Sequence, residues 1–279
     1  MLDQATRLRE IAEYHCERPR VSKPHIITVA SGKGGVGKST VALNVAVSLA
    51  NAGHATLLID ADENLGNIDV MAGISPVWRL GDVLRGEKDI EEVVLSPFTN
   101  LSILPGSSGD MRYVRMSLER QNDLLRDCAD LDTRFDFLVI DTSAGIREET
   151  ISFVIQSHEA IIVTVPQPTA IMDAYALIKM ITLNDAMVQL KVVVNNTKSP
   201  DEGEETAAKL QQAVRHFLGS DVQYLGSIPY ETSVADATVR QNAVVREFPL
   251  SGAALSLQLM AERIAEHALT SGVRRFQSQ

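Results

Sequence analysis

The chain has 279 residues, 45% of them hydrophobic and 22% charged, and a formal net charge of −10. This length can form one large domain or two small ones with a sizeable core, and the negative charge disfavours nonspecific binding to nucleic acid phosphates. The two cysteines, Cys16 and Cys128, form no C-x-x-C pair, which fits a reducing cytosol. The charged N-terminus and the short apolar runs predict a cytoplasmic protein whose membrane contacts, if it makes any, are peripheral.

The N-terminal segment differs from the rest of the chain. Residues 1–20 are compatible with a short amphipathic helix and equally with a solvated tail. Residues 21–24 then form a linker into the first strand, because Pro19 and Pro24 bracket it. The residues that would share one face of the helix are Leu2, Ala5, Leu8 and Ala12.

From residue 25 to residue 270, strand-like and helix-like segments alternate. The strand-like segments are 25–31, 55–61, 100–106, 136–142, 160–166, 190–196 and 222–229. The helix-like segments are 39–53, 117–131, 172–185, 205–219 and 255–269. Nearly continuous apolar strands that alternate with helices predict a single α/β domain, with a mostly parallel twisted sheet covered by helices on both faces. Residues 271–279 would then be a C-terminal tail.

The segment SGKGGVGKST, residues 31–40, contains a phosphate-binding loop of the form G-x-x-x-x-G-K-S. It follows a strand-like segment and opens a helix-like one, so backbone N–H groups and the helix dipole can converge on phosphates. We expect Lys38 to contact the β- and γ-phosphates and the Ser39 hydroxyl to bind Mg²⁺. The motif also contains a second lysine, Lys33, directly after the first glycine.

Carboxylates follow two other strand-like segments. Asp60 and Asp62 end the segment 55–61, and Asp141 ends the segment 136–142. The carboxyl ends of parallel strands face the same crevice as the loop. A single Asp at a strand end is often a turn or capping residue, but three of them beside a complete loop favour a site. We predict that Asp60 and Asp141 lie around the metal and that Asp62 orients the attacking water.

KGGVGKST resembles the deviant Walker A motif of the ParA/MinD ATPases, and DADENLGNIDVMAG and FDFLVIDTSAGI resemble their switch segments. The resemblance implies that Lys33 reaches across an ATP-bound homodimer to the partner's phosphates, as an arginine finger does, and that Asp173 supports it at the interface. It also implies that Asn195 reads adenine and that Pro229 packs against the base. NNTKSPD is not the guanine-binding N-K-x-D motif, so ATP is expected. The nucleotide-binding loop residues would be Gly32, Gly34, Gly35, Val36, Gly37, Lys38, Ser39 and Thr40.

The N-terminal DQATRLR resembles the DQAxxLR signature of the FlhG branch, also called FleN or YlxH, which comprises MinD-like regulators of flagellar number. The segments 168–179, 195–203 and 224–234 resemble the same branch. The resemblance implies slow regulatory ATP hydrolysis and stimulation of the partner GTPase FlhF, with Gln4 entering the FlhF active site. Other implied partners are flagellar switch proteins of the C-ring and a flagellar transcription factor. The residues implied in GTPase activation are Asp3, Gln4, Ala5, Leu8 and Arg9.

The chain departs from the family pattern in two places. Asn64 stands where the first switch has Gly, and Asn can adopt the left-handed backbone conformation that the turn needs. The C-terminus carries only a small basic and aromatic cluster, which favours either weak membrane contact or a solvated tail. The residues of this cluster are Val273, Arg274, Arg275 and Phe276.

Three other functions share this loop. A ParA-type DNA-partitioning or cargo-positioning ATPase would need a basic surface or an added DNA-binding module, which the net charge disfavours. An electron-transfer or Fe–S carrier ATPase would need cysteines near the switches, whereas Cys128 falls in a helix-like segment and reads as a small core residue. A bacterial tyrosine kinase would carry a C-terminal tyrosine cluster, but no tyrosine follows Tyr230.

Overall fold

The computed structural model describes residues 24–62, 66–107, 116–131, 135–184 and 188–276, with side chains up to Leu269. The N-terminal residues implied in GTPase activation and Asn64 lie outside this part of the chain.

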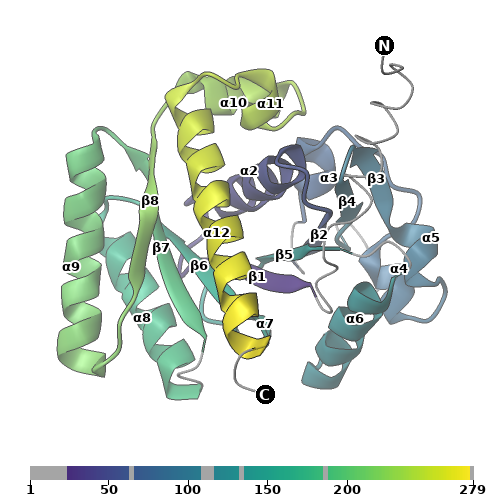
Figure 1. Cartoon of the computed structure of the whole chain (residues 1–279), viewed down its shortest axis with the longest axis horizontal. Helices are drawn as coiled ribbons and strands as arrows, with labels where there is room; N and C mark the ends of the chain where they lie inside the picture. The colour runs from purple at the N-terminus through teal and green to yellow at the C-terminus, as the bar shows by residue number, and fades with distance from the viewer. Residues whose placement is uncertain (1–23, 63–65, 108–115, 132–134, 185–187, 277–279) are drawn as a thin grey trace, which may run out of the picture.

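The described residues form one sheet of eight strands in the order β3-β4-β2-β5-β1-β6-β7-β8 (Figure 1). Neighbouring strands are parallel except β3 and β4. The strand β1 is central, and the chain turns from it toward β2 on one side and later toward β6 on the other, so the loop after β1 lies at a topological switch point. The strands are β1 His25–Ala30, β2 Thr56–Ala61, β3 Leu95–Phe98, β4 Leu101–Leu104, β5 Phe137–Thr142, β6 Glu159–Thr164, β7 Gln189–Thr197 and β8 Gln223–Pro229.

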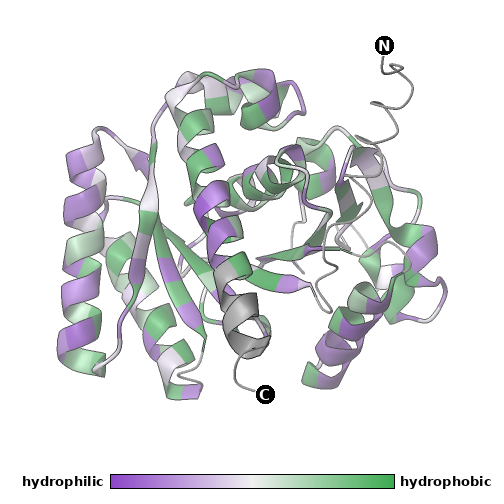
Figure 2. Cartoon of the chain, in the orientation of Figure 1, coloured by the Kyte–Doolittle hydropathy of each residue, from purple (hydrophilic) through white to green (hydrophobic). Residues whose placement is uncertain are grey.

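Helices cover both faces of the sheet, as predicted. Apolar residues of α2 and α12 pack on one face, and those of α6, α7, α8 and α9 pack on the other. Figure 2 shows the inner strands mainly hydrophobic, while α6 and α9 carry hydrophilic residues along much of their length. The helices are α2 Lys38–Asn51, α3 Ile68–Met71, α4 Leu80–Leu84, α5 Ile90–Val93, α6 Leu118–Asp130, α7 Glu148–Ile155, α8 Pro168–Asn184, α9 Pro200–Leu218, α10 Thr232–Val239, α11 Val244–Glu247 and α12 Gly252–Phe276.

Several element boundaries differ from the prediction. The helix α9 begins at Pro200, five residues before the predicted start at 205, because Ser199 accepts a hydrogen bond from the Glu202 N–H as N-cap and proline suits the first turn. The edge strand β3 was not predicted, since it is short and contains Pro97. The helix α12 continues to Phe276, past the expected start of a C-terminal tail at 271.

A buried ionic cluster lies at the amino ends of the parallel strands, opposite the loop. The Glu159 side chain at the start of β6 is fully buried and contacts Lys191 Nζ at 2.6 Å and His267 Nδ1 at 2.6 Å. His25 Nε2 lies 3.4 Å from the same carboxylate. Burial alone would raise the pKa of Glu159, but the His25 and Lys191 interactions outweigh it and lower the pKa from 4.5 to about 2. This cluster, Glu159–Lys191–His25–His267, joins β1, β6, β7 and α12.

None of the helices in the described part of the chain is long and apolar enough to cross a membrane.

Candidate nucleotide-binding site

The loop between β1 and α2 contains glycines in the left-handed backbone region. Gly37 caps α2 with φ +88°, in the left-handed region. A Cβ on Gly37 would lie 2.2 Å from Asn195 Nδ2, so only glycine fits this position. Asn195 Nδ2 also donates a hydrogen bond to the Val36 carbonyl at 2.8 Å. The end of β7 therefore holds the loop against the sheet.

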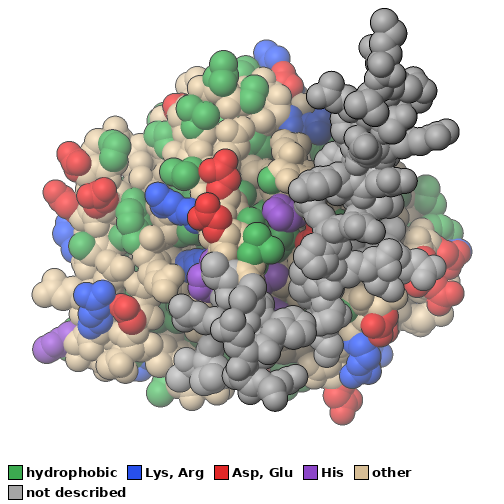
Figure 3. Space-filling model, viewed as in Figure 1, with side chains coloured by type: hydrophobic (Ala, Val, Ile, Leu, Met, Phe, Trp, Pro, Cys, Tyr) green, Lys and Arg blue, Asp and Glu red, His purple; other side chains and the backbone are tan. Residues whose placement is uncertain are grey.

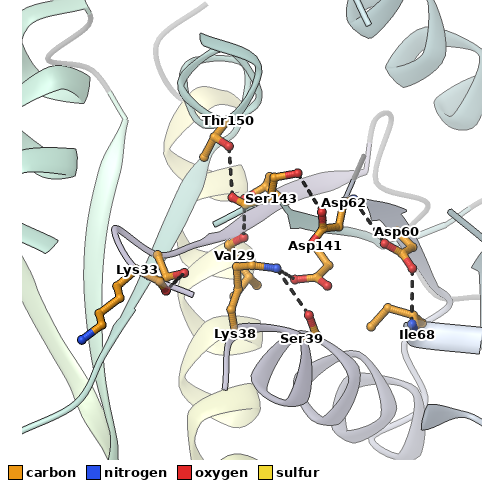
Figure 4. Close-up of polar contacts among 12 residues, drawn as sticks. Val29, Lys33, Lys38, Ser39, Asp60, Asp62, Ile68, Asp141, Ser143 and Thr150 are labelled. Carbon is orange, nitrogen blue, oxygen red and sulfur yellow. Dashed lines mark hydrogen bonds and ion pairs between the residues drawn. The ribbon is translucent and has the colours of Figure 1, made fainter. Parts of the chain in front are cut away.

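Lys38 lies inside the crevice at the carboxyl ends of the strands. Its ammonium group is buried and donates to Asp141 Oδ1 at 2.6 Å (Figure 4). The same nitrogen lies 3.4 Å from Ser39 Oγ. The structure thus brings three predicted residues together, although Lys38 pairs with the carboxylate here. Its contact with phosphates stays a prediction.

Two buried carboxylates lie on neighbouring strands beside Lys38. Asp60 and Asp141 are register partners on β2 and β5, and each is 1% exposed. Burial is the largest effect that raises the pKa of Asp60, and the charge of Asp141 is the second. Hydrogen bonds from the Asp62 and Ile68 backbone N–H groups lower the pKa, but the net result is a pKa raised to about 8. Burial also raises the pKa of Asp141, against the charge of Lys38.

The donor set fits a divalent cation. Asp141 Oδ2 is buried and has no hydrogen-bond partner among the described residues, and a cation beside Asp60 would offset the burial and the Asp141 charge that raise its pKa. Carboxylate and hydroxyl oxygens are the ligands that Mg²⁺ prefers. The predicted metal ligands Ser39, Asp60 and Asp141 therefore lie in one crevice and suit the ion, although their role as ligands stays a prediction.

Asp62, the predicted water-orienting residue, follows β2 directly. Its carboxylate accepts a hydrogen bond from Ser143 Oγ at 2.8 Å, and its backbone N–H donates to Asp60 Oδ1 at 3.2 Å. The contact with Ser143 was not predicted. The sequence signal that could have indicated this contact is the hydroxyl residue Ser143, which stands two positions after Asp141 at the end of a strand-like segment.

Lys33 points out of the crevice. Its Nζ donates to Thr169 Oγ1 in the first turn of α8 at 3.3 Å, an exposed contact, and Figure 4 shows the side chain directed away from Lys38 and Asp141. Asp173 lies one turn further along α8, where its backbone carbonyl abuts Gly32: a Cβ on Gly32 would lie 2.1 Å from that oxygen. The predicted interface residues thus gather on the surface beside the loop, together with Thr169, which was not predicted.

Asn195 and Pro229, the predicted adenine-binding residues, lie toward the carboxyl ends of two neighbouring strands. Asn195 lies near the end of β7, and Pro229 ends β8 as the register partner of Thr197. The Asn195 side chain donates to Val36 and accepts from the Asn196 N–H at 2.9 Å. Its observed contacts support the loop, and its contact with adenine stays a prediction.

Together, the doubly wound sheet and the loop after its central strand define an α/β P-loop nucleoside triphosphatase. A family model described as ParA, NUBPL iron-transfer P-loop NTPase, matches residues 22–265. The antiactivator FleN of Pseudomonas aeruginosa is 38% identical over 249 residues, which is 89% of each chain. The flagellum site-determining protein YlxH of Helicobacter pylori is 34% identical over 222 residues, 79% of this chain and 74% of that one. The chain therefore belongs to the ParA family of P-loop NTPases, in the FleN and YlxH branch that the sequence motifs predict.

Solved structures of MinD proteins have the same fold. The septum site-determining protein MinD from Pyrococcus horikoshii, complexed with Mg-ADP, has a TM-score of 0.74 at 26% identity over 88% of this chain and 97% of that one. The cell division ATPase MinD from Pyrococcus furiosus has a TM-score of 0.74 at 26% identity over 87% and 98%. The predicted MinD-like fold is confirmed, and the Mg-ADP complex supports ATP and Mg²⁺ as the cofactors.

Cys128 has a structural role. It is fully buried in α6 and packs in the apolar cluster beneath β2 and β5. Burial raises the pKa of its thiol well above the ordinary value, so the thiolate that binds iron is disfavoured. Its burial confirms the prediction that Cys128 is a small core residue. It gives no support to the iron-transfer activity in the family description.

Proposed function

We propose that the protein is an ATPase switch that controls flagellar number or placement by forming an ATP-dependent homodimer. The names of the FleN and YlxH relatives support the flagellar role. The observation that carries the dimer is the direction of Lys33, whose ammonium group lies outside its own crevice, on the surface formed with α8. A lysine in this position can reach phosphates bound by a second copy of the chain.

In this proposal, the loop N–H groups and Lys38 bind the phosphates, and Ser39, Asp60 and Asp141 hold the ion. Mg²⁺, when bound, neutralises phosphate charge. Lys38 has three N–H donors, so it can keep its Asp141 contact while it reaches toward a phosphate oxygen. Asp62 orients the water. Turnover should be slow, because the useful output is the dimeric state rather than the product.

Lys33→Gln should weaken the ATP-dependent dimer by at least about tenfold, because truncating one member of a charged interfacial contact costs this much or more. Sedimentation with ATP and Mg²⁺ would measure the dimer, and Lys209→Gln on α9 is the matched control, since Lys209 is an exposed lysine whose ion pair is with Glu205 of the same helix. A Lys33→Gln protein that dimerises like the control would contradict the proposed function.

The N-terminal segment should stimulate GTP hydrolysis by FlhF, and Gln4→Ala should abolish the stimulation. This expectation rests on the DQATRLR motif alone. The measurement is FlhF turnover with increasing concentrations of the intact protein, the Gln4→Ala variant or the control Gln212→Ala on α9. If neither the intact protein nor the control stimulates FlhF, the partner is different and the flagellar proposal loses its main output.

Flagellar switch proteins and a flagellar transcription factor remain proposed partners, and the proposed location is the cytoplasm with weak contact at the inner membrane surface. The cargo-positioning alternative has less support. Figure 3 shows Lys and Arg side chains scattered among Asp and Glu over one face of the molecule rather than gathered in one patch, and the net charge is −10. A gel shift with nonspecific DNA at low salt would test it.

A further inference from the structure

A hydrogen bond connects the two segments that end the neighbouring strands β2 and β5. Ser143 Oγ donates to Asp62 Oδ1 at 2.8 Å, across 81 positions of the sequence. Ser143 is 5% exposed. The strands place the two residues side by side, because Ala61 and Thr142, the residues just before them, are register partners. Figure 4 shows the contact beside Lys38 and Asp141.

The backbone of Ser143 is held from several sides. Its carbonyl accepts a hydrogen bond from Thr150 Oγ1 in α7 at 3.2 Å. The preceding Thr142 donates through its hydroxyl to the Val29 carbonyl in β1 at 3.0 Å. Two residues later, the Gly145 N–H donates to the Ser31 carbonyl, at the start of the phosphate-binding loop, at 2.8 Å. The Ser143 hydroxyl is therefore presented from a backbone tied to β1, to the loop and to α7.

A carboxylate that orients a water for attack must keep one position, since a displacement of about 1 Å can cost a hundredfold in rate. A hydroxyl donor fixed on one carboxylate oxygen limits the rotation of the group. Ser143 makes this contact with Asp62 from a backbone segment that is itself hydrogen-bonded to β1, to the loop and to α7. The same backbone contacts the loop, so the position of Asp62 depends on the arrangement of both.

We propose that Ser143 is the positioning residue for Asp62, and that it couples the segment after β5 to the water-orienting carboxylate. The proposal rests on the proposed role of Asp62 in hydrolysis and adds a residue through which that role is controlled. Ser143 acts on the rate of the chemical step and contributes little to nucleotide affinity, because its hydroxyl donates to Asp62.

Ser143→Ala should lower kcat for ATP hydrolysis roughly tenfold, the loss expected for one hydrogen bond to a charged group, while KM for ATP changes less than about twofold. Ser143→Thr, which keeps the hydroxyl, should recover most of the rate. Ser152→Ala is the matched control, because Ser152 in α7 is also 5% exposed and contacts Gln156 rather than Asp62. Thermal unfolding of each variant would show that it is folded.

Asp62→Asn separates the two levels of the proposal. If Asp62→Asn lowers kcat by about 10²-fold or more and Ser143→Ala on that background causes no further loss of the residual rate, the two residues act as a unit, as proposed. If Asp62→Asn lowers kcat to this extent but Ser143→Ala matches the Ser152→Ala control, the positioning role is wrong and the role of Asp62 survives. If Asp62→Asn leaves kcat unchanged, both are wrong. Should Ser143→Ala fail to fold, Ser143→Thr and Ser143→Cys decide: a rate that does not follow the hydroxyl overturns the proposal.

Discussion

Asp62→Ala is expected to reduce kcat for ATP hydrolysis by about 10²–10³-fold and to leave an ATP-bound dimer that persists. A reduction in kcat of this size is expected when a residue that positions or deprotonates a reacting group is removed. Nucleotide binding should survive, because the phosphates are assigned to the loop and to Lys38, and Asp62 contacts Ser143 and Asp60 instead. Hydrolysis would then fail at the step that normally releases the dimer.

Phosphate release and sedimentation, followed over the same time course, would measure the two effects together. Asp236→Ala on α10 is a suitable control, since this aspartate is exposed and far along the chain from the switch segments. Fast turnover in the Asp62→Ala protein would move the water-orienting role to another group. Slow turnover without a persistent dimer would instead separate hydrolysis from dimer release and contradict the switch mechanism.

The sequence was sufficient to predict the sheet because the buried strands are apolar at almost every residue. Such runs, as in FLVIDT of β5, have little ambiguity when they alternate with amphipathic segments. The phosphate-binding loop was equally clear, because its glycines and lysine have fixed spacing. The sequence did not predict β3, because this strand has only four residues and contains a proline. It also missed the early start of α9, because that start depends on a cap at Ser199 rather than on hydrophobic periodicity.

Contacts between distant residues could not be predicted from local patterns. The pairing of Lys38 with Asp141 joins residues 103 positions apart, and that of Ser143 with Asp62 joins residues 81 positions apart. Motifs indicated that Lys38, Asp62 and Asp141 share a crevice, but the register of β2 and β5, which pairs Ala61 with Thr142, is what places Asp62 beside Ser143. For Lys33, the motif indicated a role in the partner's site, and its outward direction needed the structure.

The sequence did not predict the Glu159–Lys191–His25–His267 cluster, because its residues belong to no recognisable motif. Glu159→Ala should lower the free energy of unfolding by about 3–5 kcal/mol, since removing one member of a buried pair leaves the other charge uncompensated. Lys191, at 3% exposure, cannot regain water without opening β7. Urea denaturation would measure the loss, with Glu262→Ala on the exposed side of α12 as control. A loss no larger than that of the control would show that the cluster contributes nothing.

Acid provides an independent check on Glu159. Its pKa is lowered from 4.5 to about 2 in the folded protein, so the ionised group stabilises the fold above pH 4.5, and this contribution of about 3 kcal/mol disappears as the pH falls through 2. The difference in unfolding free energy between the native protein and Glu159→Gln should therefore shrink between about pH 5 and pH 2.

Adding Lys191→Met to Glu159→Gln should restore part of the stability at neutral pH, because the cost of the single variant is an unpaired buried cation rather than a lost attraction. If the double variant is as unstable as the single one, the cluster instead holds β1, β6, β7 and α12 together through its hydrogen bonds.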